Sequence, residues 1–188
     1  GSCGLVGSES SIFFSKKNFK ILGVDDNSRK YFFGKDGDIS WVKQNLKNKV
    51  KNYIHFNTDI TNYKSLEKIF KKYRSKISVI IHCAAQPSHD WAKKKIFEDF
   101  EVNAIGTLNL LELTKFYCPE SPFIFMSTNK VYGDTPNNLP LVEKKFRWEI
   151  SKNHKFKTGI DETMTIDNSI HSFFGVSKIY ADLAVQEY

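Results

Sequence analysis

Cysteine is scarce in this sequence, which contains three, Cys3, Cys83 and Cys118, far apart along the chain. Because the number of cysteines is odd and their spacing is not paired, the sequence argues against a disulfide framework. It also lacks the ligand pattern of a zinc site. We therefore expect no metal centre. Unpaired cysteines are typical of a reducing compartment, so the sequence predicts a cytoplasmic protein.

Long apolar runs are also absent. No stretch approaches the roughly 20 residues that a membrane-spanning helix needs, and no secretory signal is recognisable. No repeat, low-complexity tract or linker divides the chain. Because 188 residues with 40% hydrophobic content can bury a substantial core, we expect one domain over residues 1–188.

The excess of positive charge, +7 in total, is not concentrated in one place. The longest lysine run, Lys93 to Lys95, is soon followed by Glu98 and Asp99. Such mixed charge indicates a solvated helix face rather than a phosphate-binding patch. We expect neither nucleic acid nor a membrane surface as a partner.

Short β-branched runs alternate with amphipathic segments along the chain. The runs that predict strands are Phe19 to Asp26, Tyr53 to Ile60, Ser78 to Ala85 and Pro122 to Thr128. Predicted helices cover Leu5 to Lys17 and about Asn62 to Arg74, with one or two more within Trp91 to Tyr117. Continuous apolar strands alternating with helices predict an α/β fold with a doubly wound parallel sheet of Rossmann type, layered α/β/α.

One segment interrupts this alternation. Gly133 to Ile170 contains two prolines and many polar residues, and it has no sustained hydrophobic period. Long irregular segments in compact domains are often covers over a functional site. A surface insertion explains the composition equally well, and the sequence leaves both interpretations open.

The opening residues, GSCGLVGS, place Gly1, Gly4 and Gly7 in a G-x-x-G-x-x-G pattern directly before an apolar helical segment. Glycines at these positions permit a tight turn and a close approach of backbone N–H groups to a pyrophosphate. The positive end of the helix dipole favours the same anion. The pattern predicts a dinucleotide-binding loop.

An acidic residue supports this prediction, because the next predicted strand ends near Asp25, eighteen residues after Gly7. A carboxylate there can accept hydrogen bonds from an adenosine ribose and repel a 2′-phosphate. NAD is therefore favoured over NADP, although the nearby Arg29 and Lys30 leave NADP open.

The ends of two further strands carry residues of the right kind. Asp59 and Ile60 end one strand, and Ala84, Ala85 and Pro87 end or follow the next. Ligands of open α/β sheets bind at the carboxyl ends of the strands, and small side chains let a cofactor lie against the backbone. We expect these residues to lie beside the glycine loop.

Five segments taken together, GSCGLVG, HCAAQPS, VNAIGT, MSTNKVYG and FFGVSK, resemble the extended short-chain dehydrogenase/reductase family and its NAD-dependent nucleotide-sugar epimerases and dehydratases. Within this group, STNKVYGD, RWE, GIDE and HSFFGVSK resemble the CDP-paratose 2-epimerase-like branch. The resemblance implies contacts to NAD from Gly1, Gly4, Leu5, Val6, Gly7, Asp25, Asp59, Ile60, Ala84, Ala85, Asn103 and Lys178. It also implies that the Thr128 hydroxyl binds the substrate, a nucleotide-sugar.

The sequence departs from the family pattern at Phe174, where a catalytic tyrosine is expected four residues before Lys178. Phenylalanine cannot take the proton of a sugar hydroxyl, a transfer that typically contributes about 10²–10⁴-fold in rate. His171 would share a face with these residues if the helix reached back to it, although a hydrogen-bonding role at the helix start is the plainer interpretation. Tyr132 and a desolvated Lys178 are the other candidate bases.

The resemblance therefore favours an NAD-dependent nucleotide-sugar epimerase that acts by transient oxidation of a sugar carbon. A dehydratase or reductase of the same family is the near alternative, and Phe174 keeps a catalytically impaired NAD-binding sensor or partner protein open. In this family a strand precedes the glycine loop and a substrate domain follows the lysine helix. We expect the chain to be a fragment that lacks both and is poorly stable and inactive alone, and the longer protein to form a homo-oligomer.

Overall fold

The computed structural model describes residues 1–188 and contains two pairs of parallel strands. Strand β1 (Ile21–Val24) pairs with β2 (Tyr53–Phe56), and β3 (Ile80–His82) pairs with β4 (Phe123–Phe125). Each pair is joined by crossover helices, as parallel strands require. The order of strands and helices agrees with the predicted α/β architecture.

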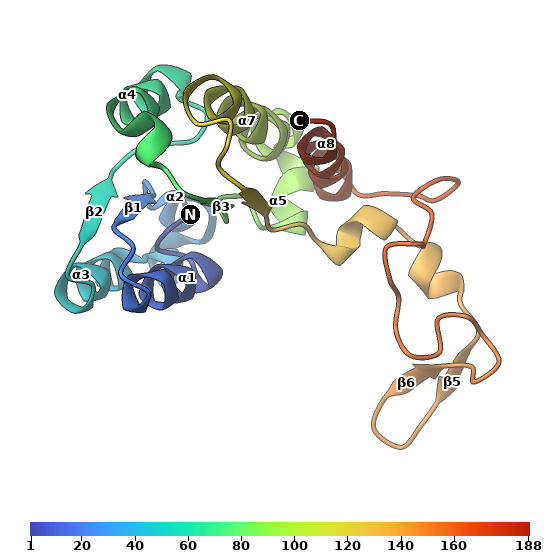
Figure 1. Ribbon diagram of the computed structural model, residues 1–188. Helices are drawn as coiled ribbons and strands as arrows, with labels where there is room; N and C mark the ends of the chain where they lie inside the picture. Colours follow the sequence, from blue (N-terminus) through green and yellow to red (C-terminus); the bar gives the residue numbers. More distant parts are fainter.

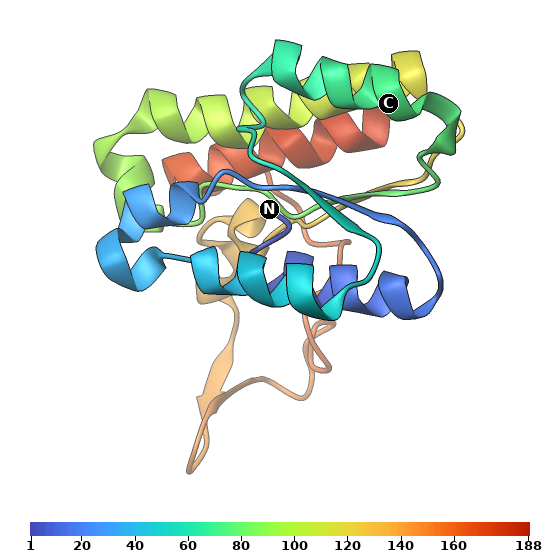
Figure 2. The same ribbon diagram turned by 90° about the vertical axis from the view of Figure 1, so that its left-hand side faces the viewer.

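Helices cover both faces of the strands, which gives three layers (Figures 1 and 2). On one side lie α1 (Leu5–Lys16) and α3 (Ser40–Lys49), and on the other lie α4 (Tyr63–Tyr73), α7 (Gly106–Tyr117) and α8 (Phe173–Glu187). The larger core cluster lies on the second side and consists of Ile60, Leu66, Phe70, Leu110, Leu113 and Cys118. This cluster fixes α4 and α7 against the strands.

Local chemistry explains where α4 begins and which face it buries. The Asn62 side chain accepts a hydrogen bond from Ser65 N at 3.0 Å, and it thereby caps the first turn. Leu66, Ile69 and Phe70 are buried at i, i+3 and i+4, the spacing of one helix face. The prediction of a helix from Asn62 to Arg74 is therefore correct to within one residue at each end.

Two helices between β1 and β2 were not predicted. These are α2 (Ser28–Phe33), which the short helix η1 (Gly34–Gly37) follows, and α3. The signal for α3 is present in the apolar series Val42, Leu46 and Val50, and Leu46 and Val50 pack with Cys3 in a second small core. Mixed polar residues between them obscure this period.

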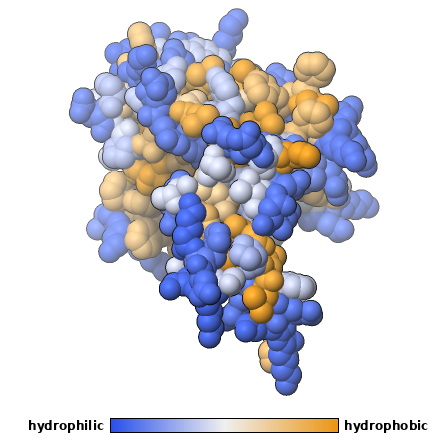
Figure 3. All heavy atoms as spheres, turned by 90° about the vertical axis from the view of Figure 1, so that its right-hand side faces the viewer, coloured by the Kyte–Doolittle hydropathy of each residue, from blue (hydrophilic) through white to orange (hydrophobic).

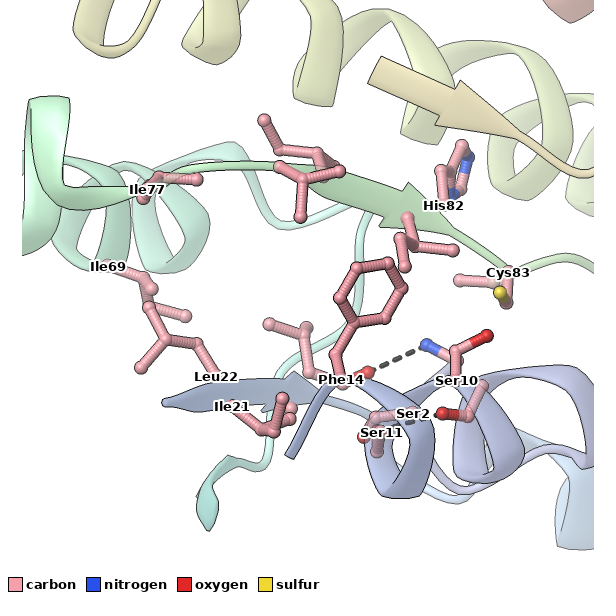
Figure 4. Close-up of a pocket in the computed structure, with 18 of the residues that line it drawn as sticks. Ser2, Ser10, Ser11, Phe14, Ile21, Leu22, Ile69, Ile77, His82 and Cys83 are labelled. Atoms are coloured by element: carbon pink, nitrogen blue, oxygen red, sulfur yellow. Dashed lines mark hydrogen bonds between the residues drawn. The ribbon is translucent and has the colours of Figure 1, made fainter. Parts of the chain in front are cut away.

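The inner edges of β1 and β3 are not paired with each other. Between them lies a cavity of about 280 Å³, which we call the inter-strand slot, with mostly apolar walls that include Ile21, Leu22, Ile69 and Ile77. Figure 4 shows Phe14 pointing from α1 into this space. Because each of these strands is paired on one edge only, the observed strands are about half as long as the predicted ones.

The predicted helical region after β3 forms α5 (His89–Lys94) and then a continuous run of α6 (Ile96–Phe100), the π-helical turn η3 (Glu101–Ile105) and α7. Inside a longer helix, π-helical turns are frequent at functional sites because they re-aim side chains. Here the turn contains Asn103, one of the predicted cofactor-binding residues.

The irregular segment projects from the body of the molecule (Figure 1). It contains an antiparallel hairpin of β5 (Leu141–Glu143) and β6 (Trp148–Ile150), and hydrophilic side chains dominate its far end (Figure 3). In this arrangement it is a surface insertion, and it does not cover the strand ends. None of the helices combines the length and the apolar character needed to cross a membrane.

Candidate active site

The glycine loop is packed tightly against the end of β3. A Cβ atom at Gly7 would lie 2.0 Å from the Gly1 carbonyl oxygen, and one at Gly1 would lie 2.5 Å from Ala84 N. At Gly4, by contrast, the nearest atom would be 3.5 Å away. Helix α1 begins at Leu5 without a side-chain cap, so its first N–H groups are available to an anion.

One cavity of about 260 Å³, the cofactor cavity, opens over this loop. Every predicted cofactor-binding residue lines it except Asn103 and Lys178: Gly1, Gly4, Leu5, Val6, Gly7, Asp25, Asp59, Ile60, Ala84 and Ala85. The strand ends therefore meet as predicted. Lining residues that the sequence analysis did not assign to the site include Asp26, Ser28, Phe32, Thr58 and Met126.

Asp25 is held in place beneath the mouth of this cavity. Its carboxylate accepts hydrogen bonds from Cys3 N and Asn27 N, each at 2.9 Å, and only 9% of the residue is exposed. A carboxylate has about four acceptor positions, so two remain for ribose hydroxyls. Its fixed negative charge opposes a 2′-phosphate.

Arg29 and Lys30, the two cations that could have favoured NADP, contact other residues in the structure. Lys30 Nζ lies 2.8 Å from a carboxylate oxygen of Asp38, and the guanidinium of Arg29 lies over the Phe33 ring. Arg29 does line the cofactor cavity. The residues present fit the unphosphorylated dinucleotide: bare N–H groups for its pyrophosphate, room at Gly4, and a carboxylate for its ribose.

Asn103 lies behind the cavity wall in a buried polar network. Its Oδ1 accepts from Gln86 N at 2.9 Å, and its Nδ2 donates to Asp99 at 3.1 Å and to Ser177 Oγ at 3.2 Å. Ser177 in turn donates to Asp99 at 2.6 Å. Burial raises the pKa of Asp99, while hydrogen bonds from Ser177 and Gln86 oppose the shift. The network ties η3 to α8 and to the loop after β3.

Lys178 is an almost completely buried lysine on α8, with 4% exposure. Its Nζ donates to the Met126 carbonyl oxygen at 2.7 Å and lies 4.0 Å from the centroid of the Phe125 ring. Burial lowers the pKa of Lys178 to about 8, although the charges of Asp182 and Asp99 oppose the shift. Because Met126 lines the cofactor cavity, Lys178 lies next to that cavity without lining it.

This depressed pKa predicts a specific pH dependence of stability. The pKa of an unfolded lysine is about 10.4, whereas the pKa of Lys178 in the folded protein is about 8. Between these values the unfolded state holds a proton that the folded state lacks, so the free energy of unfolding rises with pH. The rise over this window should be about 3 kcal/mol, because one pKa unit corresponds to about 1.4 kcal/mol.

Urea unfolding of the full-length protein at several pH values between 7.5 and 10.5 measures this rise. Wild-type stability should increase relative to Lys178→Met across the window, whereas the exposed Lys93 provides a control, Lys93→Met, that follows the wild type. Parallel pH profiles for wild type and Lys178→Met would contradict the assignment.

Phe174 and Thr128 do not line the cofactor cavity. Phe174 is 9% exposed in the first turn of α8, one helical turn before Lys178. Thr128 is half-buried after β4, and its Oγ1 accepts a hydrogen bond from Lys130 N at 3.3 Å. A phenyl ring therefore occupies the position where the family pattern has a phenol.

His171 does not lie on the helix face of Phe174 and Lys178, because the helix does not reach back to it. Helix α8 begins at Phe173, and its cap is Ser172, whose Oγ accepts from Gly175 N at 3.0 Å. His171 is thus neither inside the helix nor its cap. One ring nitrogen, Nε2, is 2.9 Å from the Ile166 carbonyl oxygen, while Nδ1 is buried without a hydrogen-bond partner.

The two tyrosines near the site are also engaged. Tyr132 donates its hydroxyl to the Asp161 carbonyl oxygen at 3.3 Å, and burial raises its pKa, so even less phenolate is present at neutral pH to accept a proton. Tyr180 packs its ring against Phe100 at 5.7 Å between centroids. Among the candidate bases, Lys178 has the environment best suited to accepting a proton.

A bare helix N-terminus over a glycine loop, a buried acid at the next strand end and alanines at the facing strand end define a dinucleotide-binding α/β protein. The sequence profile of the NAD dependent epimerase/dehydratase family matches residues 1–188. The chain belongs to this NAD-dependent enzyme family. NAD is therefore its cofactor.

Curated relatives include nucleotide-sugar epimerases and a dTDP-glucose 4,6-dehydratase. The CDP-paratose 2-epimerase of Salmonella typhi is 30% identical over 188 residues, which is 100% of this chain and 51% of that protein. The UDP-glucuronate 4-epimerase of Thermodesulfobacterium geofontis is 31% identical over 137 residues, 72% of this chain and 40% of that protein. The chain thus spans about half or less of the length of these relatives.

Solved structures confirm the Rossmann-type fold. The UDP-Glc/GlcNAc 4-epimerase of Campylobacter jejuni superposes with a TM-score of 0.72 at 20% identity, covering 100% of this chain and 46% of that one. The UDP-glucose 4-epimerase of Bifidobacterium longum, solved with NAD⁺ and UDP, gives 0.71 at 18% identity, covering 99% and 46%. At these identities the likeness concerns the fold alone.

Proposed function

We propose that the protein is a nucleotide-sugar epimerase that transiently oxidises a sugar carbon, and that its reaction is the conversion of CDP-paratose to CDP-tyvelose. The observation that carries this proposal is the single cavity that unites the glycine loop, Asp25 and the alanines after β3, with a desolvated lysine beside it. The 30% identity to a CDP-paratose 2-epimerase over the whole chain supports the choice of sugar.

In this proposal the chain's own residues bind, orient and move a proton. Bound NAD supplies hydride acceptance and return at the sugar carbon. Lys178, with its pKa lowered to about 8, is neutral in roughly a tenth of the molecules near pH 7, far more than an unperturbed lysine, and in that form it accepts the proton of the sugar hydroxyl. Thr128 provides a hydroxyl that hydrogen-bonds the sugar.

The test uses the full-length protein loaded with NAD and offered CDP-paratose, CDP-tyvelose, UDP-glucose and UDP-glucuronate separately. Epimerisation of CDP-paratose, read by NMR of the product, with transient NADH absorbance at about 340 nm, is expected. Turnover should fall by about 10²-fold or more in Lys178→Met. His171→Ala should retain turnover, because its imidazole lies outside α8.

A second candidate is favoured by Phe174, a buried ring without a hydroxyl at the position of the family tyrosine. It is an NAD-binding sensor or partner protein that has lost catalysis. NAD binding without NADH formation or inverted stereochemistry on any sugar would favour this candidate. Loss of water from the sugar would instead identify the dehydratase alternative.

We also propose that these residues form the cofactor-binding part of a longer chain. A further apolar strand between β1 and β3 would fill the inter-strand slot, and a later segment would hold the nucleotide of the sugar. The unpaired inner edges of β1 and β3 and the greater length of the relatives support this arrangement.

The assembly state and the location of the protein belong to the same proposal. Apolar side chains are exposed on adjoining helices, with Phe97 92% exposed on α6 and Val176 and Leu183 about half exposed on α8. A second copy covering this face gives a homodimer, which sedimentation of the full-length protein can detect.

The three cysteines are free, which supports a cytoplasmic location.

A further inference from the structure

Three aromatic rings meet beside the cofactor cavity, and one of them, Phe32, lines it. Tyr31 and Phe32 belong to α2, and Trp91 belongs to α5. The Trp91 ring contacts Tyr31 at 5.4 Å and Phe32 at 5.5 Å between centroids, both edge to face. Because α2 follows β1 and α5 follows β3, these contacts connect the two halves of the molecule that the inter-strand slot separates.

The same contacts join the two walls of the cofactor cavity. Phe32 lines the cavity from the β1 side together with Ser28 and Arg29. Pro87 lines it from the β3 side and stands four residues before Trp91. The ring contacts therefore connect two segments that each contribute to the wall of the cavity.

The two ends of this connection are anchored differently. On the α5 side, Ser88 Oγ accepts from Trp91 N at 3.1 Å, and the fully buried Gln86 side chain donates to Asp99 at 2.7 Å and to Ser88 O at 2.9 Å. On the other side, α2 buries none of its residues. The α5 end is therefore anchored through buried groups, whereas α2 is exposed and held by polar contacts to Asp38, from Asn27 at 2.9 Å and from Lys30 at 2.8 Å.

The indole of Trp91 carries an unsatisfied donor. Its Nε1 is buried and has no hydrogen-bond partner. Buried donors normally have an acceptor, and an oxygen-rich ligand supplies many. This donor and the ring contacts can be separated by experiment, because phenylalanine keeps an aromatic ring and removes the N–H.

We propose that Tyr31, Phe32 and Trp91 form an aromatic clasp that closes over bound NAD and limits the rate at which the cofactor leaves. The inference rests on NAD occupying the cofactor cavity, as the proposed function requires. Slow release suits an enzyme that must return the hydride to the same sugar before the reduced cofactor departs. Edge-to-face ring contacts supply the closing interaction without a covalent bond or a metal ion.

The test measures dissociation of NADH from the full-length protein by stopped-flow fluorescence, with excess ADP-ribose as the competitor. Trp91→Ala should release NADH at least 10-fold faster, and Tyr31→Ala, which removes one exposed ring, about 3-fold faster. Trp91→Phe should stay near the wild-type rate if the ring contacts dominate. Phe116, an exposed ring on α7 in contact with Tyr117, provides the control Phe116→Ala, which should remain unchanged.

Unchanged release rates in Trp91→Ala and Tyr31→Ala would overturn the clasp, as would a loss of affinity that arises from slower association alone. The Tyr31 variant keeps the test decisive if Trp91→Ala fails to fold. Wild-type protein that binds no NADH would overturn both the clasp and the proposed function. Normal clasp kinetics with no sugar turnover would overturn the proposed epimerase activity and leave the clasp standing.

Discussion

Replacing Phe174 by tyrosine is expected to raise epimerase turnover by about 10²-fold, toward the lower end of what general acid–base catalysis typically contributes. The new phenol would stand one helical turn before Lys178, and residues at i and i+4 on a helix are neighbours. A cation beside a phenol lowers the phenol's pKa and favours the phenolate. The gain is at the lower end because the neutral fraction of Lys178 already accepts the proton in the wild type, whereas the predominant cationic fraction would stabilise the new phenolate.

The chain supplies a matched control for this substitution. Phe173 is the adjacent phenylalanine in the same helical turn, and it is 49% exposed, whereas Phe174 is 9% exposed. Phe173→Tyr adds the same hydroxyl on another face and should leave turnover within about 2-fold. Steady-state kinetics at pH 7 and 9 distinguish the two variants. Equal effects of both substitutions, or none from Phe174→Tyr, would show that position 174 does not face the sugar.

Expressed by themselves, the 188 residues are expected to unfold without a cooperative transition. The parallel strands form two separate two-stranded sheets, so the inner edges of β1 and β3 leave backbone N–H and C=O groups unpaired. The apolar walls of the inter-strand slot would also face water. We expect a free energy of unfolding below about 2 kcal/mol, compared with about 5–15 kcal/mol for typical domains.

Circular dichroism during urea titration, together with binding of a hydrophobic dye, measures this outcome. The isolated segment should lose its helical signal gradually and bind the dye before denaturant is added. The full-length protein should unfold in a single sharp step under the same conditions. A sharp transition in the isolated segment would mean that the slot is closed by contacts within these residues.

Much of the cofactor site could be predicted because its residues are set by local requirements. Gly1 and Gly7 have no room for a Cβ atom, and Asp25 ends a strand beside them. These steric and hydrogen-bonding requirements allow only certain residue types at fixed spacings, so the site can be recognised from the sequence. The fold class follows from the same alternation of apolar strands and helices.

The rest of the site depends on contacts between distant segments. Asp99 bonds to Ser177, which lies 78 residues later in the chain. No spacing rule connects an acid on α6 to a serine on α8, so the sequence analysis did not find Asp99. His171 shows the same limit, because the start of α8 at Phe173 was decided by the Ser172 cap, which the sequence analysis did not identify.

The hydrogen bonds beneath α8 have a consequence for how this site can change over time. Ser177 and Asn103 fix the rotation of the helix through Asp99, and neither bond involves the side chain at position 174. The ring at position 174 can therefore gain or lose an oxygen atom without disturbing the orientation of the helix. The residue that would take part in proton transfer and the residues that fix the helix are therefore different ones, so a single substitution at position 174 can change the first while the second stay in place.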